Sequence, residues 1–223
     1  MTDSPASTVT TVFLDLDGTL TDPADGITRS IAYALERLDL PVPPRAELET
    51  AIGPPLWEAL PGFGVPPEDI DRAVVLYRER YTDVGLFENT PYDGVFDMLE
   101  ALRAEGLRLA LATSKPIAYA ARITARFGLA DYLDFEFGSE MDGVRADKRD
   151  LLAYALAETG ADPAHSAMLG DRLHDARGAL HNGITSLGAL WGYGSHEELT
   201  KAGVHAVVEA PAGVVPAVRA IGR

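Results

Sequence analysis

Short apolar runs alternate with helix-like segments along much of the chain. The first run is residues 11–16, TVFLDL, and similar runs follow at Leu107–Thr113, Ser166–Asp171, Ile184–Leu190 and, more weakly, His205–Ala210. Short, mostly apolar runs are typical of parallel strands whose two faces are both covered. The pattern therefore predicts five buried strands.

The segments between these runs have the period and the end signals of helices. They are residues 95–106, 116–128, 148–160 and 195–203, and each ends at a glycine. Glycine is common just past a helix end because it readily adopts the left-handed conformation found there. Strands that alternate with helices predict an α/β fold, here a Rossmann-like three-layer sandwich around a doubly wound parallel sheet.

A long segment after the first run breaks this alternation. Residues 25–40 carry a stripe of apolar side chains at helical spacing, and residues 66–87 form a second helical pattern. A Gly-Pro-Pro turn, Gly53–Pro55, lies between them. We therefore expect a helical domain inserted into an α/β core domain. The expected bounds are 22–90 for the insert and 1–21 with 91–223 for the core.

Composition restricts the setting of the protein. The chain has 223 residues, 47% of them hydrophobic, and no cysteine. No apolar stretch approaches the roughly 18–20 residues of a membrane span. Residues 1–11 are polar and lack the basic start of a signal peptide, so they predict a short disordered lead-in. Without cysteine, disulfides and thiol catalysis are excluded, and a cytoplasmic location is the simplest expectation.

The net charge of −15 restricts the partners. Such a balance argues against binding to nucleic acid or to anionic membranes. The field of the whole protein would also repel a small anionic ligand. Any site for a phosphate therefore needs local cations that reverse the field.

Polar side chains gather where the predicted strands end. They are Asp15 and Asp17 after the first strand, Thr113, Ser114 and Lys115 after the second, and Asp171 after the third. Open parallel sheets bind ligands beyond the carboxyl ends of their strands, so we expect these side chains to line one cleft. Lys148 opens the helix before the third strand and is a further candidate. A cleft also explains why a buried strand ends in two carboxylates, since buried unpaired charge is costly.

This set of residues suits phosphoryl chemistry. Several carboxylates favour a hard cation such as Mg²⁺, and two lysines with the metal would offset the charge of a phosphate. One carboxylate can attack phosphorus and carry an aspartyl-phosphate, while another two residues along can protonate the leaving alcohol. In a regular strand Asp15 and Asp17 would crowd on one side. The chain is expected to leave strand geometry there, which Gly18 permits.

Four segments resemble the motifs of the haloacid dehalogenase superfamily. Residues 15–22, DLDGTLTD, resemble the first motif of its phosphatases, Thr113 matches the second and Lys148 the third. GDRLHD, residues 170–175, matches the fourth. The order and spacing of the motifs agree over essentially the whole chain.

The resemblance implies a role for each matching residue. It implies that Asp15 is the nucleophile and Asp17 the acid/base, and that the helical insert is a small cap that closes over the substrate. The remaining implied assignments are Mg²⁺ held by Asp15, the Asp17 main-chain carbonyl and Asp171 with support from Asp175, and phosphoryl oxygens bound by Thr113 and Lys148. Gly18 and Ser114 are further candidates for phosphate binding.

Within the superfamily, the chain is similar to the phosphoglycolate phosphatase branch. The segments IGPPL, LYRERY, GLFEN and LWGYGS resemble a bacterial subgroup described as 5′-nucleotidase-like. One position departs from the family pattern: many relatives have proline after the third-motif lysine, where this chain has Arg149. Arg145 and Arg149 therefore stay open as alternatives to Lys148 for the phosphate contact.

These observations predict a Mg²⁺-dependent phosphomonoester hydrolase that acts on a small phosphorylated metabolite as a monomer or homodimer. The stiff, apolar IGPPL turn favours nucleoside 5′-monophosphates over phosphoglycolate. A phosphomutase and a non-catalytic phosphate-binding regulatory module are the alternatives, and the intact Asp15–Asp17 pair counts against the module. Side chains outside the motifs are expected in structural roles: Trp57 in the core of the insert, and Arg78, Arg80 and His174 in solvent.

Overall fold

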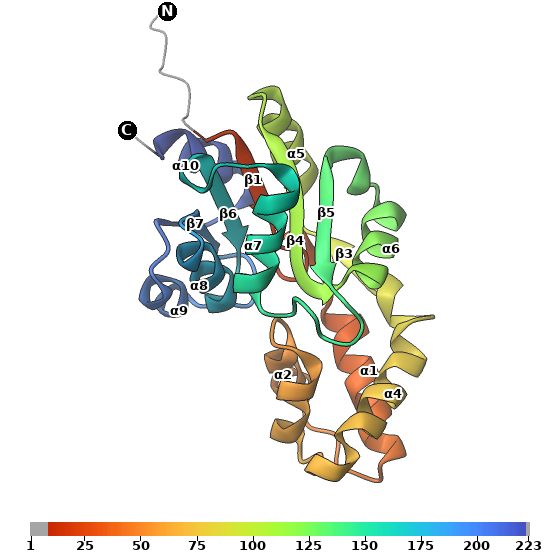
Figure 1. Cartoon of the computed structure of the whole chain (residues 1–223). Helices are drawn as coiled ribbons and strands as arrows, with labels where there is room; N and C mark the ends of the chain where they lie inside the picture. The colour runs from red at the N-terminus through yellow and green to blue at the C-terminus, as the bar shows by residue number, and fades with distance from the viewer. Residues whose placement is uncertain (1–8, 222–223) are drawn as a thin grey trace, which may run out of the picture.

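The computed structural model describes residues 9–221 and contains one six-stranded sheet with helices on both faces (Figure 1). The strand order is β5-β4-β1-β6-β7-β8, and every pairing is parallel. The strands are β1 (Thr11–Leu14), β4 (Arg108–Pro116), β5 (Phe135–Ser139), β6 (Ser166–Gly170), β7 (Thr185–Ala189) and β8 (Ala206–Val208). The predicted doubly wound α/β fold is confirmed.

The alternation of side chains along β1 explains the three layers. Val12 and Leu14 face the apolar core on one side of the sheet, and Phe13 faces the core on the other. Helices α7 (Lys148–Thr159) and α8 (Leu173–His181) cover the Phe13 side. The other side is covered by α5 (Val95–Ala104), α6 (Ile117–Phe127) and α10 (Val214–Ala220). Helix α9 (His196–Ala202) packs beside α8 and β8.

Strand β5 was missing from the five predicted strands. It lies at the edge of the sheet beside β4, and its sequence FEFGS alternates apolar and polar residues instead of forming a continuous apolar run. Phe137 is buried, whereas Glu136 is partly exposed. An edge strand is half covered, so the signal for a fully buried strand does not apply to it.

The helical block, residues 23–89, lies between two short strands, β2 (Thr21–Asp22) and β3 (Thr90–Pro91), which pair antiparallel. Its longest helices, α1 (Ala24–Arg37) and α4 (Ile70–Tyr81), pack against each other beyond the carboxyl ends of the sheet strands (Figure 1). The division into two domains at these bounds stays a prediction. The block also contains α2 (Arg45–Leu48), α3 (Leu56–Ala59) and the 3₁₀ helices η1 (Glu49–Ala51), η2 (Leu60–Phe63), η3 (Pro67–Asp69) and η4 (Gly85–Phe87).

The predicted helix over 66–87 is shorter than expected, because η3 and η4 flank α4 as separate turns. The outer connections of the sheet contain three more 3₁₀ helices, η5 (Ala130–Tyr132), η6 (Pro163–His165) and η7 (Pro211–Gly213). Residues 1–8 of the expected lead-in lie outside the described residues, and Thr11, its last residue, already belongs to β1. Between residues 9 and 221, no helix has the length and apolar character needed to span a bilayer.

Candidate active site

The strand order places the candidate site beside β1. From β1 the chain builds β4 and β5 on one side and then β6, β7 and β8 on the other, so the order switches at β1. Ligands of such sheets bind beyond the carboxyl ends at this switch. A cavity of about 130 Å³ opens there, and its wall includes Asp15, Asp17, Thr113 and Lys148. The structure thus brings together side chains predicted from three separate segments.

The turn after β1 separates the two carboxylates of the first motif. Pairing with β4 and β6 ends at Leu14, and the amides of Leu20 and Thr21 both donate to the carbonyl of Leu16. Gly18 has φ +84°, and a Cβ at this position would collide with the carboxylate of Asp171. The predicted departure from strand geometry is therefore present. Gly18 itself lies against Asp171 and is not part of the cavity wall.

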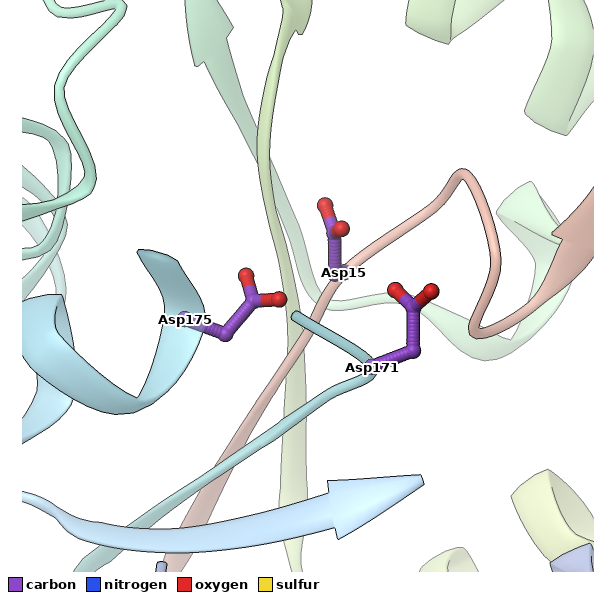
Figure 2. Close-up of side chains that lie close together, drawn as sticks. All are labelled: Asp15, Asp171 and Asp175. Carbon is purple, nitrogen blue, oxygen red and sulfur yellow. The ribbon is translucent and has the colours of Figure 1, made fainter. Parts of the chain in front are cut away.

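Three buried carboxylates form a cluster beside the cavity, and two of them, Asp15 and Asp175, are part of its wall. Asp15 follows β1, Asp171 follows β6 and Asp175 lies in the first turn of α8 (Figure 2). One oxygen from each lies within 4.8 Å of the others. Asp171 is held by two hydrogen bonds, from the Tyr193 amide at 2.8 Å and from the Thr19 hydroxyl at 3.3 Å.

Lys148 is the cation that reaches this cluster. Its Nζ lies 2.8 Å from Asp15 Oδ1, 2.7 Å from Asp175 Oδ1 and 2.7 Å from the carbonyl of Ala112. Burial acts to lower the pKa of Lys148, but the carboxylates of Asp15 and Asp175 outweigh it and raise that pKa. The two alternative cations have other partners, since Arg149 binds Asp147 and Arg145 binds Glu140.

The cluster holds more negative charge than Lys148 can balance. Burial raises the pKa of Asp171 well above its usual value, and the neighbouring carboxylates of Asp175 and Asp15 raise it further. Burial also raises the pKa of Asp175 to about 6, although Lys148 opposes this. A divalent cation would supply the missing positive charge. Three carboxylate oxygens are hard donors of the kind that Mg²⁺ prefers, so these residues fit that ion.

Asp17 forms a second ion pair, with Lys115. Burial raises the pKa of Asp17, although Lys115 opposes this from 2.5 Å away, measured between Nζ and Oδ2. The same ammonium donates a 2.6 Å hydrogen bond to the hydroxyl of Tyr81, the last residue of α4. Thr113 is buried nearby, and its hydroxyl accepts a hydrogen bond from the Lys115 amide. Ser114 also lines the cavity.

The helical block supplies the opposite wall of the cavity. Gly53–Leu56, most of the IGPPL turn, faces the site together with Tyr77 and Trp57. Trp57 is 39% exposed and lies against Gly143, so it is not in the core of the block as expected. Tyr119 of α6 lies beside Tyr81 and completes an aromatic lining.

Two side chains expected in solvent line the cavity, Arg78 from the helical block and His174 from α8. Arg78 lines the cavity and donates a 2.8 Å hydrogen bond to the carbonyl of Met141. His174 is half-buried in the wall, where burial and then the nearby Arg172 and Arg177 lower its pKa. Arg80 faces away from the cavity and binds Glu88.

Sequence reasoning missed three residues that support the site. Tyr193 supports Asp171 through its amide, and the glycines on either side of it allow this close approach, which is a usable sequence signal. Arg172, within the fourth motif, donates to the carbonyl of Ile52 and lies 3.0 Å from Glu198. It places a cation beside the IGPPL turn. Tyr81 ends the LYRERY segment, but nothing in the sequence places it beside Lys115, because only the fold brings α4 there.

Comparison with known proteins agrees with this geometry. Residues 9–183 match the family model of haloacid dehalogenase-like hydrolases. A 5′-nucleotidase from Pseudomonas aeruginosa is 43% identical over 189 residues, covering 84% of this chain and 86% of that protein. Tyrosine-protein kinase PtkA from Mycobacterium tuberculosis is 39% identical, covering 93% and 71%. A crystal structure described as a predicted phosphatase from Clostridium acetobutylicum superposes with a TM-score of 0.90 at 36% identity, covering 94% and 98%.

Proposed function

The chain belongs to the haloacid dehalogenase-like hydrolases and is a phosphatase, and we propose that it hydrolyses small phosphomonoesters through a phosphorylated Asp15 with Mg²⁺ as cofactor. One observation carries the proposal: Lys148 holds Asp15 in the same cavity wall as Asp17, at the switch in strand order. A nucleophile and a second carboxylate that can exchange protons are then available to one bound phosphate.

The residues divide the reaction into two displacements. Oδ2 of Asp15 attacks phosphorus, the bond from phosphorus to the leaving oxygen breaks, and Asp17 gives its proton to that oxygen. Asp17 then takes a proton from water, which attacks the phosphorus of the aspartyl-phosphate and releases inorganic phosphate. This step restores Asp15. The Lys148 ammonium, which binds Oδ1 of Asp15, and the Thr113 hydroxyl bind the phosphoryl oxygens meanwhile.

The carboxylate cluster is the proposed Mg²⁺ site. Asp15, Asp171 and the main-chain carbonyl of Asp17 would hold the ion, with Asp175 supporting them. Bound Mg²⁺ would neutralise charge on the phosphoryl group, which an acidic protein of net charge −15 would otherwise repel. Two of these proposed ligands are held in place by neighbours: Lys148 orients Asp15, and the amide of Tyr193 orients Asp171.

Nucleoside 5′-monophosphates are the proposed substrates. The wall opposite the carboxylates consists mainly of apolar side chains, including two prolines and several aromatic rings, and Trp57 of this wall is partly exposed. Such a wall excludes water and favours the flat, apolar face of a base. The name 5′-nucleotidase of the Pseudomonas aeruginosa relative supports the same class.

Phosphoglycolate is the second candidate, because Arg78 lines the same cavity. A guanidinium can bind a carboxylate through two parallel hydrogen bonds. Arg78 donates one hydrogen bond to the Met141 carbonyl. Arg172 lies near the IGPPL turn, so the turn is less apolar in its surroundings than its sequence indicates.

A substrate panel tests both parts of the proposal. We expect turnover of small phosphomonoesters with Mg²⁺ and none in excess EDTA, and full turnover in EDTA would contradict the metal assignment. Among substrates, kcat/KM for nucleoside monophosphates should exceed that for phosphoglycolate. A tenfold preference for phosphoglycolate, about 1.4 kcal/mol of transition-state binding, would reverse the substrate assignment.

A further inference from the structure

Lys115 joins a carboxylate of the sheet end to a hydroxyl of the helical block. Its Nζ lies 2.5 Å from Asp17 Oδ2 and 2.6 Å from the hydroxyl of Tyr81. Only 6% of the Lys115 side chain is exposed, and Tyr81 is 2% exposed. Neither residue has a role in the reaction proposed above. A buried lysine held this closely needs a structural or functional reason, since burying its charge is costly.

The contact distinguishes the two oxygens of Asp17. Oδ2 accepts the charge-assisted contact from Lys115, whereas Oδ1 is buried without a hydrogen-bond partner. Rotation of the carboxylate would break a short ion pair between two side chains that are largely buried, so its orientation is fixed. Oδ1 is therefore the oxygen left to exchange a proton with the leaving group and with water.

Lys115 is itself fixed from two directions. At the sheet end, β4 changes register between Thr113 and Pro116, and the Lys115 amide donates to the Thr113 hydroxyl. From α4, Tyr81 reaches the ammonium with a ring that is stacked on Tyr77 at 4.9 Å between centroids. A lysine stem is flexible, and these contacts reduce it to one geometry.

We propose that Lys115 is the positioning residue for the acid/base carboxylate of Asp17, and that Tyr81 holds Lys115 in place from the helical block. This inference rests on the proposed function, because it takes Asp17 as the group that exchanges protons. It also links the helical block to the chemistry. When α4 is close enough for Tyr81 to bind Lys115, that ion pair engages Oδ2 of Asp17 and leaves Oδ1 without a partner.

The dependence of rate on the leaving group tests this proposal. An alkyl oxygen needs a proton to leave, whereas p-nitrophenolate leaves without help. We expect Lys115→Met to lower kcat/KM about 100-fold for an alkyl phosphate and less than tenfold for p-nitrophenyl phosphate, within the range that general acid catalysis supplies. Tyr81→Phe should change the ratio of the two values in the same direction by about threefold to tenfold. Lys115→Arg should restore part of the ratio.

The ratio is measured on one preparation with two substrates, so a loss of folded protein cancels from it. Lys201→Met removes an exposed lysine paired with Glu197 and should leave the ratio unchanged. Tyr33→Phe removes a different hydroxyl link of the helical block, the one to Glu79 outside the cavity wall, and should also leave the ratio unchanged. Equal losses on both substrates in Lys115→Met would overturn the positioning role.

Asp17→Asn distinguishes a failure of the positioning role of Lys115 from a failure of the proposed acid/base role of Asp17. If Asp17→Asn changes the ratio and Lys115→Met does not, the acid/base role stands and the positioning role is wrong. If Asp17→Asn lowers both rates equally, Asp17 is not the acid, and the proposed function fails at that residue. We expect both variants to change the ratio in the same direction, with the larger change in Asp17→Asn.

Discussion

The two walls of the cavity differ in almost every physical property. The wall at the sheet end contains carboxylates and lysines that are buried and joined by ion pairs below 3 Å. The wall from the helical block contains mainly aliphatic, aromatic and proline side chains, and Arg78 is its principal charge. The difference indicates that the parallel sheet fixes the phosphoryl chemistry, while the inserted helices determine what else the cavity accepts.

The two walls are joined by few polar contacts. Lys115 reaches Tyr81, Arg78 reaches the carbonyl of Met141, and Arg172 reaches the carbonyl of Ile52. The hydroxyl of Tyr119 also pairs with Thr82. By contrast, each carboxylate of the sheet wall follows or adjoins a strand in a continuous hydrogen-bonded sheet. Apart from Asp17 and Lys115, whose loss should depend on the leaving group, substitutions at the sheet wall should therefore affect all substrates alike. Substitutions at the block wall should affect substrates unequally.

The largest effect is expected at Asp15. The asparagine in Asp15→Asn has almost the same shape as the aspartate, but an amide is a very poor nucleophile. We therefore expect kcat to fall on the order of 10⁴-fold or more for every substrate. Thermal unfolding should show an intact fold. Asp39→Asn replaces an exposed acid and serves as the control, with activity unchanged. Substantial activity in Asp15→Asn would place the nucleophile elsewhere.

A smaller but uniform loss is expected at Lys148. Lys148→Met removes the ammonium that pairs with Asp15 and Asp175, and kcat/KM should fall roughly 10²–10³-fold regardless of leaving group. Arg149→Met is the matched control, because this neighbouring cation is exposed and binds Asp147. If Arg149→Met caused the larger loss, Lys148 would not be the main phosphate contact.

The contrast between the walls also explains what the sequence could reveal. Asp15, Thr113 and Asp171 were found because strand ends are marked by apolar runs and because parallel strands share one edge. The place of Tyr81 beside Lys115 was not predicted, and Trp57 was wrongly expected in the core of the insert, since the packing of the inserted helices sets both positions and no periodic pattern encodes it. Strand β5 was missed for a related reason: an edge strand does not need a continuous apolar run.

The excess negative charge of the sheet wall should appear in the stability of the metal-free protein. The pKa of Asp175 is about 6 when folded and about 4 when unfolded, so the folded state binds more protons between these values. Stability contributed by this group is therefore lost as pH rises from about 4 through about 6. Asp171, whose pKa burial also raises, acts in the same direction.

Asp171→Asn should reduce this loss. It removes one carboxylate from the cluster, and we expect the free energy of unfolding at pH 7 without metal to rise by about 1–2 kcal/mol, or roughly 2–8 °C in Tm. At pH 4 the variant and the wild type should differ less. Mg²⁺ should then stabilise the variant less than the wild type. A Tm of Asp171→Asn below the wild type at both pH values would show that the hydrogen bonds of Asp171 outweigh its charge.

The smallest effect, and the one that most sharpens the contrast, concerns Trp57. Its ring lines the cavity from the block wall and lies against Gly143, so it can serve the substrate or the packing of the wall. If the indole contacts a base, Trp57→Ala should lower kcat/KM for nucleoside monophosphates about threefold more than for p-nitrophenyl phosphate, a fraction of what base stacking can contribute. Val75→Ala, at an exposed position on α4, should change neither. Equal losses on the two substrates would assign Trp57 to packing against Gly143. The block wall would then determine specificity through Arg78, and phosphoglycolate would become the better substrate to test first.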